Sequence, residues 1–227
     1  MTKHVIPNEI PVELWKAHAE FTGRDKWRTV YNSTLSQYFK HPLKDVEHHW
    51  LISSDGYILL ATPLPTHLFG VVGDRNVIAR KDLVRLGKSR KPEDEFDVMV
   101  ETHVAAPLPD IGKLFNDVHW TGANAQIVPS QQSDWPEALI VDPDDDGYCL
   151  IKTAHWKIST SREPEWRPQF VSPNHLERVT DHLGPLIVHQ GPKELSPLLA
   201  IPDSAYRSSP TWIPDDTIAL IMVTRPF

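Results

Sequence analysis

Two residues near the middle of the chain, Glu101 and His103, have the types and the spacing for acid–base chemistry. Charged and apolar residues alternate over 96–104, which predicts a β-strand with Glu101 and His103 on one face, about 7 Å apart. A carboxylate beside an imidazole can fix the ring tautomer and raise its basicity. We therefore predict His103 as a base oriented by Glu101. The solvated face of a structural strand would have the same pattern.

Such a reaction also needs a second acid and a group that binds the substrate. His119, at the end of an expected helix, and His155, just after an expected strand, are the candidates for the second acid. The run 75–91 contains seven Lys or Arg and one acid, so we predict that Arg80 and Arg85 bind an anionic group. A solvated loop or short helix with local charge pairing would explain this run equally well.

An acidic loop offers a different chemistry, because Asp142, Asp144 and Asp146 stand at alternate positions before a glycine. This is the first half of a calcium loop, in which carboxylates converge on one cation. The twelfth position, which should be a bidentate Glu, is Thr153, so an EF-hand is excluded. We retain a calcium or magnesium site as one hypothesis and a solvated turn, which needs Asp and Gly for its backbone, as the other.

Composition restricts the class of protein. The 227 residues carry a net charge of −7, which argues against nucleic acid as a partner, because neutralising phosphates requires a basic face. The single cysteine, Cys149, permits no disulfide within the chain. No apolar run approaches the roughly 20 residues needed to cross a bilayer. We expect a soluble cytoplasmic protein without a membrane partner.

Four helices are expected from apolar residues at helical spacing and from proline and glycine at the ends. They cover 11–21, 25–40, 109–120 and 173–183. The eight tryptophans are spread along the chain and are expected to anchor its packing. Trp156 is also a candidate substrate contact, since aromatic rings can form a ligand platform.

Strands are expected where apolar and β-branched runs are bounded by turn residues. Asp-Gly pairs predict hairpins over 49–60 and 139–151, and a shorter hairpin is expected over 71–78. Further strands are expected at 186–188 and 217–224, with a long loop over 192–214. These elements predict an α+β fold with a mainly antiparallel sheet built from hairpins, two N-terminal helices, and two later helices packed on the sheet.

We expect one domain, 1–227, with a helical part over 11–41 and a sheet-rich remainder. The nucleotide-binding, serine-hydrolase and zincin motifs are absent from the sequence. The first functional hypothesis is a cofactor-free enzyme, a hydrolase or lyase, that uses acid–base or metal-assisted chemistry on a small polar or anionic substrate. The alternative is a non-enzymatic binding protein, such as an inhibitor or immunity-type partner, that uses the acidic loop and exposed tryptophans as its contact surface.

Overall fold

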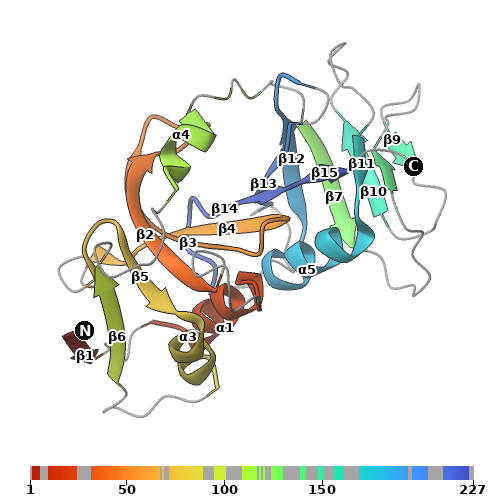
Figure 1. The fold of residues 1–227 in the computed structure, drawn as a ribbon. Coiled ribbons are helices and arrows are strands. Elements are labelled where there is room, and N and C mark those ends of the chain that lie inside the picture. The colour runs from red at the N-terminus through yellow and green to blue at the C-terminus, as the bar shows by residue number, and fades with distance from the viewer. Residues whose placement is uncertain are drawn as a thin grey trace. The chain divides into compact units, whose positions relative to one another are not determined.

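The structure, a computed structural model, is drawn in Figure 1. It describes residues 2–5, 10–24, 32–66, 68, 72–88, 95–100, 109–116, 118, 120, 124–129, 139–141, 148–150, 156–160, 169–193, 196–203 and 212–224. Internal contacts divide the chain into two compact units. Unit 1 comprises Met1–Asp117 with Trp212–Thr217, and unit 2 comprises Val118–Thr211 with Ile218–Phe227.

Unit 1 contains an antiparallel sheet whose strands follow the order β1-β6-β5-β2-β3-β4. Their bounds are β1 (Thr2–Val5), β2 (Ser33–Lys40), β3 (Glu47–Ser54), β4 (Ile58–Pro63), β5 (Asn76–Ala79) and β6 (Glu95–Val100). The predicted hairpin over 49–60 is confirmed as β3 and β4. Its turn forms because the Asp55 carboxylate accepts the backbone N–H groups of Tyr57 and Ile58, at 2.9 and 3.0 Å, while Gly56 takes a φ of 95°.

Among the described residues of unit 1, the helices α1 (Val12–Phe21), α3 (Arg80–Leu86) and α4 (Ile111–Asn116) accompany this sheet. α1 and α4 confirm the helices predicted over 11–21 and 109–120, the second being shorter than expected. α1 packs against β3 and β4. α4 packs on β2, where the ring of Phe115 stacks on that of Phe39 with the two ring centroids 5.4 Å apart. The helices thus bury the apolar side chains that the sheet presents.

Unit 2 contains two antiparallel sheets, with strand orders β14-β13-β12-β7-β10-β9 and β15-β11-β8. Their bounds are β7 (Asn124–Pro129), β8 (Leu139–Val141), β9 (Tyr148–Leu150), β10 (Trp156–Thr160), β11 (Gln169–Val171), β12 (Leu186–Gln190), β13 (Leu198–Pro202), β14 (Ile218–Ile221) and β15 (Val223–Thr224). α5 (Pro173–Leu183) confirms the predicted helix over 173–183. It contacts β14, and Leu176, Val179 and Leu183 are fully buried. The α+β class and the mainly antiparallel sheet are therefore confirmed.

The helix predicted over 25–40 is wrong, because its C-terminal half is the strand β2. Thr34, Ser36 and Gln37 are buried in this strand, so the sequence lacks the polar–apolar alternation that marks a half-exposed strand. The structure accommodates these polar groups with hydrogen bonds: the Ser36 hydroxyl, for example, donates to the Gly73 carbonyl at 2.6 Å. Residues 25–31 lie outside the described part of the chain.

The hairpin predicted over 139–151 is wrong in its pairing, although both of its strands exist. β8 pairs with β11 in one sheet, whereas β9 pairs with β10 in the other. The loop predicted over 192–214 contains β13, a buried strand between β12 and β14. Two flanking prolines, Pro197 and Pro202, made this short apolar segment resemble a loop.

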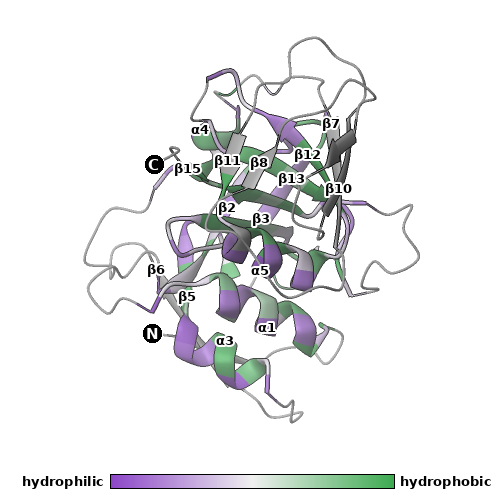
Figure 2. Ribbon diagram, turned by 90° about the vertical axis from the view of Figure 1, so that its right-hand side faces the viewer, coloured by the Kyte–Doolittle hydropathy of each residue, from purple (hydrophilic) through white to green (hydrophobic). Residues whose placement is uncertain are grey.

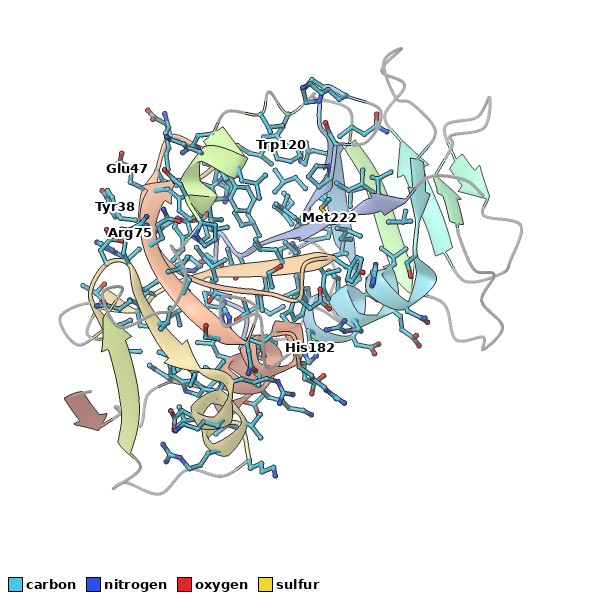
Figure 3. The ribbon with its side chains drawn as sticks, viewed as in Figure 1. Tyr38, Glu47, Arg75, Trp120, His182 and Met222 are labelled. Atoms are coloured by element: carbon cyan, nitrogen blue, oxygen red, sulfur yellow. The ribbon has the colours of Figure 1, made fainter. Side chains whose placement is uncertain are left out.

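Two other strand predictions need correction. In the hairpin predicted over 71–78, Val72 lies in no strand, and the second arm is β5, which pairs with β2 and β6. The continuous strand predicted over 217–224 is interrupted at Met222, labelled in Figure 3, which is 39% exposed. β14 and β15, on either side of it, belong to different sheets. Among the described residues, no helix is long and apolar enough to span a membrane.

Candidate functional site

Helices α1 and α3 of unit 1 pack side by side (Figure 1). At the start of α3, the Nε of Arg80 donates a hydrogen bond to the carbonyl of Ala19 at 3.2 Å. At its end, Gly87 lies against Lys16, one turn earlier in α1. The helix pair therefore brings residues from two distant parts of the sequence onto one surface.

The contact at Gly87 is unusually close because glycine has no side chain. A β-carbon at this position would lie 2.9 Å from both the backbone nitrogen and the Cα of Lys16. Helix α3 ends there, with the Gly87 N–H donating to the Leu83 carbonyl at 2.9 Å. The backbone of Lys16 therefore lies against Gly87, the residue before Lys88, and both lysines are exposed.

Apolar packing fixes the buried side of both helices. Leu83 and Leu86 of α3 join Leu14 and Trp15 of α1 in one hydrophobic cluster, and all four side chains are at most 1% exposed. Burial of such side chains contributes roughly 1.5–3 kcal/mol each. The opposite sides of the helices are left to polar residues, and both helices carry hydrophilic residues beside hydrophobic ones in Figure 2.

A buried polar network also holds α1 on the sheet. His18 is completely buried, and its ring nitrogens Nδ1 and Nε2 are hydrogen-bonded to the hydroxyls of Ser53 on β3 and Thr62 on β4, at 2.9 and 2.8 Å. The Ser53 hydroxyl is in turn hydrogen-bonded to that of Thr34 on β2. Because both ring nitrogens have partners, the network orients α1 as well as attaching it.

The outer surface of the helix pair is predominantly basic. Its exposed cations are Lys16, Lys81, Arg85 and Lys88, which together we call the α1–α3 basic face. Arg85 also has an acidic neighbour on α3, since one of its Nη atoms lies 3.5 Å from a carboxylate oxygen of Asp82. Since the whole chain has a net charge of −7, this local excess of cations stands against an acidic background and can attract anions.

The structure leaves most of the sequence-predicted site untested. Glu101, His103, His119 and His155 lie outside the described residues, as do Asp142, Asp144 and Asp146 of the acidic loop. Trp156 is the first residue of β10, opposite Pro129 of β7. Arg80 and Arg85 both lie on α3, where Arg80 is half-buried against α1 and Arg85 is exposed.

No group of three or more His, Cys, Asp or Glu residues that could hold a metal ion occurs within the described ranges. The sequence reasoning missed Lys16, which belongs to the same surface as Arg85. Its only signal was its place on the polar side of a predicted helix, and nothing in the sequence linked that helix to the run 75–91.

A second polar cluster of unit 1 lies around the turn between β2 and β3. The carboxylate of Asp216 accepts hydrogen bonds from Lys44 and from His48 Nε2, the latter at 3.0 Å. His41, in the same turn, is 2% exposed, and its burial, reinforced by the positive charge of Lys44, lowers the pKa to about 4. This cluster attaches the segment Trp212–Thr217 to the rest of unit 1.

The sequence matches no protein-family model and no curated protein. Its structure, however, resembles several solved structures of DNA polymerase III beta subunits and sliding clamps. DNA polymerase III subunit beta from Borrelia burgdorferi has a TM-score of 0.62 at 9% identity, over 99% of this chain and 64% of that one. Caulobacter crescentus pol III beta has a TM-score of 0.62 at 12% identity, over 100% of this chain and 67% of that one. A DnaN sliding clamp from Pseudomonas aeruginosa, bound to griselimycin, has a TM-score of 0.61 at 12% identity, over 99% and 66%.

These likenesses overturn the functional prediction made from the sequence. A cofactor-free hydrolase or lyase acting on a small-molecule substrate is wrong, as is the inhibitor or immunity-type alternative, because the fold is shared with subunits named for DNA polymerase and with sliding clamps. The prediction that nucleic acid is an unlikely partner is contradicted by the same likenesses. The metal site predicted at Asp142, Asp144 and Asp146 lies outside the described residues. Net charge is an average over the whole chain, and it does not reveal a local group of exposed cations such as Lys81, Arg85 and Lys88.

At 9–12% identity, what the comparison establishes is the fold. The chain spans about two thirds of the length of the solved structures it matches, with coverage from 64 to 68%. It has the fold of the sliding clamps over that part of their length.

Proposed function

We propose that this chain is a clamp-like protein without enzymatic activity that binds double-stranded DNA through the α1–α3 basic face. The observation that carries the proposal is the presence of this face, in which an acidic chain has four exposed cations on two adjacent helices and just after the second one. The resemblance to proteins named as sliding clamps and DNA polymerase III subunits supports the choice of DNA as the partner.

The chemistry of the face suits the phosphate backbone. Lysine and arginine side chains replace the counterions condensed on DNA, and the released ions drive an association that weakens as salt rises. Such contacts position a protein on the duplex without reading its sequence. Because Lys16, Lys81 and Lys88 are long, exposed side chains, they can exchange phosphates as the duplex moves.

The acidic remainder of the chain contributes to the same function. With a net charge of −7, most of the protein repels DNA, whereas the basic face attracts it. A charge distribution of this kind orients an approaching duplex toward one surface. An acidic isoelectric point is therefore compatible with DNA binding when the cations are gathered in one place.

The test is DNA binding by fluorescence anisotropy, with a labelled duplex of about 30 base pairs and NaCl varied from about 25 to 200 mM. We expect the affinity to fall with salt. The triple variant Lys81→Gln, Arg85→Gln and Lys88→Gln should weaken binding by at least about tenfold at low salt and reduce the log–log salt slope by up to about 2.7.

The matched control removes three positive charges from other exposed positions: Lys40→Gln, Lys113→Gln and Lys193→Gln. It changes the net charge equally and should leave most of the affinity intact. Absence of salt-dependent binding by the wild-type chain, or equal weakening in both triple variants, would overturn the proposal.

A further inference from the structure

The two helices of the basic face contribute opposite charges. The ionisable residues exposed on α3 and just after it are all cations, namely Lys81, Arg85 and Lys88. On α1 the single exposed cation, Lys16, stands between two exposed carboxylates, Glu13 and Glu20. The basic face thus has acidic residues built into one of its two helices.

The spacing places these carboxylates beside Lys16. Glu13 and Glu20 stand three residues before and four residues after it, so all three side chains share one side of the helix. At a rise of about 1.5 Å per residue, each carboxylate lies roughly 5 Å from Lys16 along the axis. This separation is within the screening length of about 8 Å at physiological ionic strength.

The close crossing at Gly87 brings the same carboxylates near the cations of α3. Lys16 lies directly against Gly87, and at the other end of the contact the Arg80 Nε is bonded to the carbonyl of Ala19, the residue before Glu20. A phosphate held by the α3 cations would therefore lie within the field of both carboxylates.

Resting on the proposed function, we infer that Glu13 and Glu20 limit the affinity of the basic face for DNA. Each carboxylate offsets part of the attraction that the four cations exert on a phosphate, because charges this close are only partly screened. The result is a contact that is basic enough to attract a duplex and weak enough to release each phosphate as the duplex moves. The two acidic residues therefore set the affinity of the contact and do not select a DNA sequence.

Both acidic residues are exposed on α1. Both side chains point outward, while α1 is held from the opposite side by the buried residues Leu14, Trp15 and His18. Glutamine keeps the length and the helix propensity of glutamate. Glu13→Gln also loses a favourable interaction with the helix N-terminus, a small cost to stability.

The test compares the double variant Glu13→Gln with Glu20→Gln against the wild-type chain in the anisotropy titration. We expect affinity to rise by about three- to tenfold at about 50 mM NaCl, with a correspondingly slower dissociation. The difference should shrink as NaCl approaches about 500 mM, because screening then removes the effect of the carboxylates.

A control with the same change in net charge is Asp45→Asn with Asp215→Asn, two exposed carboxylates of unit 1 outside the helix pair. If this control tightens binding as much as the α1 variant, or if the α1 variant binds like the wild type, the inference is overturned. In either case the proposed function still stands, provided that the wild-type chain binds DNA and the α3 triple variant weakens that binding. A wild-type chain that does not bind DNA would overturn both.

Discussion

Gly87 at the end of α3 lies so close to Lys16 of α1 that a β-carbon on the glycine would come within 2.9 Å of the lysine backbone. Real β-carbons do not approach backbone atoms so closely, so any side chain at this position must push the two helices apart. The basic face depends on this contact, because it sets the separation between Lys16 and the cations of α3.

We predict that Gly87→Ala lowers the free energy of unfolding by about 1–3 kcal/mol, the range found for overpacked sites. Helix propensity alone would predict the opposite sign, because alanine has a higher helix propensity than glycine by about 1 kcal/mol and Gly87 has a helical φ of −77°. Urea unfolding at pH 7 measures the effect. A variant more stable than the wild type would mean that the helices separate at little cost.

The buried network around His18 gives a second prediction. His18→Leu keeps a similar volume but leaves the hydroxyl of Thr62 without its imidazole partner. We expect a loss of about 2–3 kcal/mol in the free energy of unfolding, because an unsatisfied buried polar group bears its full desolvation cost.

The control for His18 removes the partner as well. The double variant His18→Leu with Thr62→Val should recover part of the loss, since replacing both members of a buried hydrogen bond by apolar groups is far less costly than removing one. A double variant whose loss equals the sum of the two single losses would show that the pair acts only through packing.

Local signals in the sequence were sufficient for several elements of the fold. Helix α5 begins after Ser172, at Pro173, and ends before Gly184, as the sequence predicts, because the preferences of proline and glycine for helix ends act over a few residues. The turn at Asp55 and Gly56 is equally local. Strand pairing is not determined locally. The partners of β8 and β9 lie in segments that no turn residue identifies.

The candidate site was predictable in part for a related reason. The basic run that contains Arg80 and Arg85 is visible in the sequence, and helix α3 places Arg85 on the surface. Lys16 joins that surface only because α1 and α3 pack together at Gly87. A contact between segments so far apart in sequence leaves no local pattern, and the net charge of −7 conceals the cluster that the contact creates.

Acid should destabilise the protein through His41. Burial and the nearby positive charge of Lys44 lower the pKa of His41 from 6.5 to about 4, against the opposing effect of Asp216. The unfolded chain therefore binds a proton between about pH 6.5 and 4 that the folded protein does not. Stability is full above pH 6.5 and falls as the pH decreases, by up to roughly 3 kcal/mol at pH 4.

The variant His41→Asn tests this dependence. Asparagine can still accept the backbone N–H of Leu43, which His41 Nδ1 accepts at 3.1 Å, but it does not titrate. Urea unfolding from pH 7.5 to 4.5 should give a flatter profile for the variant than for the wild type. The prediction fails if the two profiles differ only by a constant offset.

Asp216 should stabilise unit 1 more than a fully exposed carboxylate in the same region does. Although burial alone would raise the pKa of Asp216, hydrogen bonds from Lys44 and His48 lower it. The stabilisation from this carboxylate is therefore present above its ordinary pKa of 3.8 and is lost as the pH falls below that value. Asp216 has a φ of 67°, a conformation that asparagine also tolerates. Asp216→Asn therefore removes the charge without adding backbone strain.

The expected cost of Asp216→Asn at pH 7 is about 0.5–1.5 kcal/mol, because its side chain is only 19% exposed. Asp45→Asn is the matched comparison. The Asp45 side chain is 96% exposed and pairs with Lys40 at 2.7 Å, and an exposed pair of this kind contributes little to stability because solvent screens it. Urea unfolding at about 50 and 500 mM NaCl separates the two, since salt should abolish the small effect at Asp45 and leave most of that at Asp216. Equal losses in the two variants at both salt concentrations would mean that Asp216 does not fasten the segment Trp212–Thr217 to unit 1.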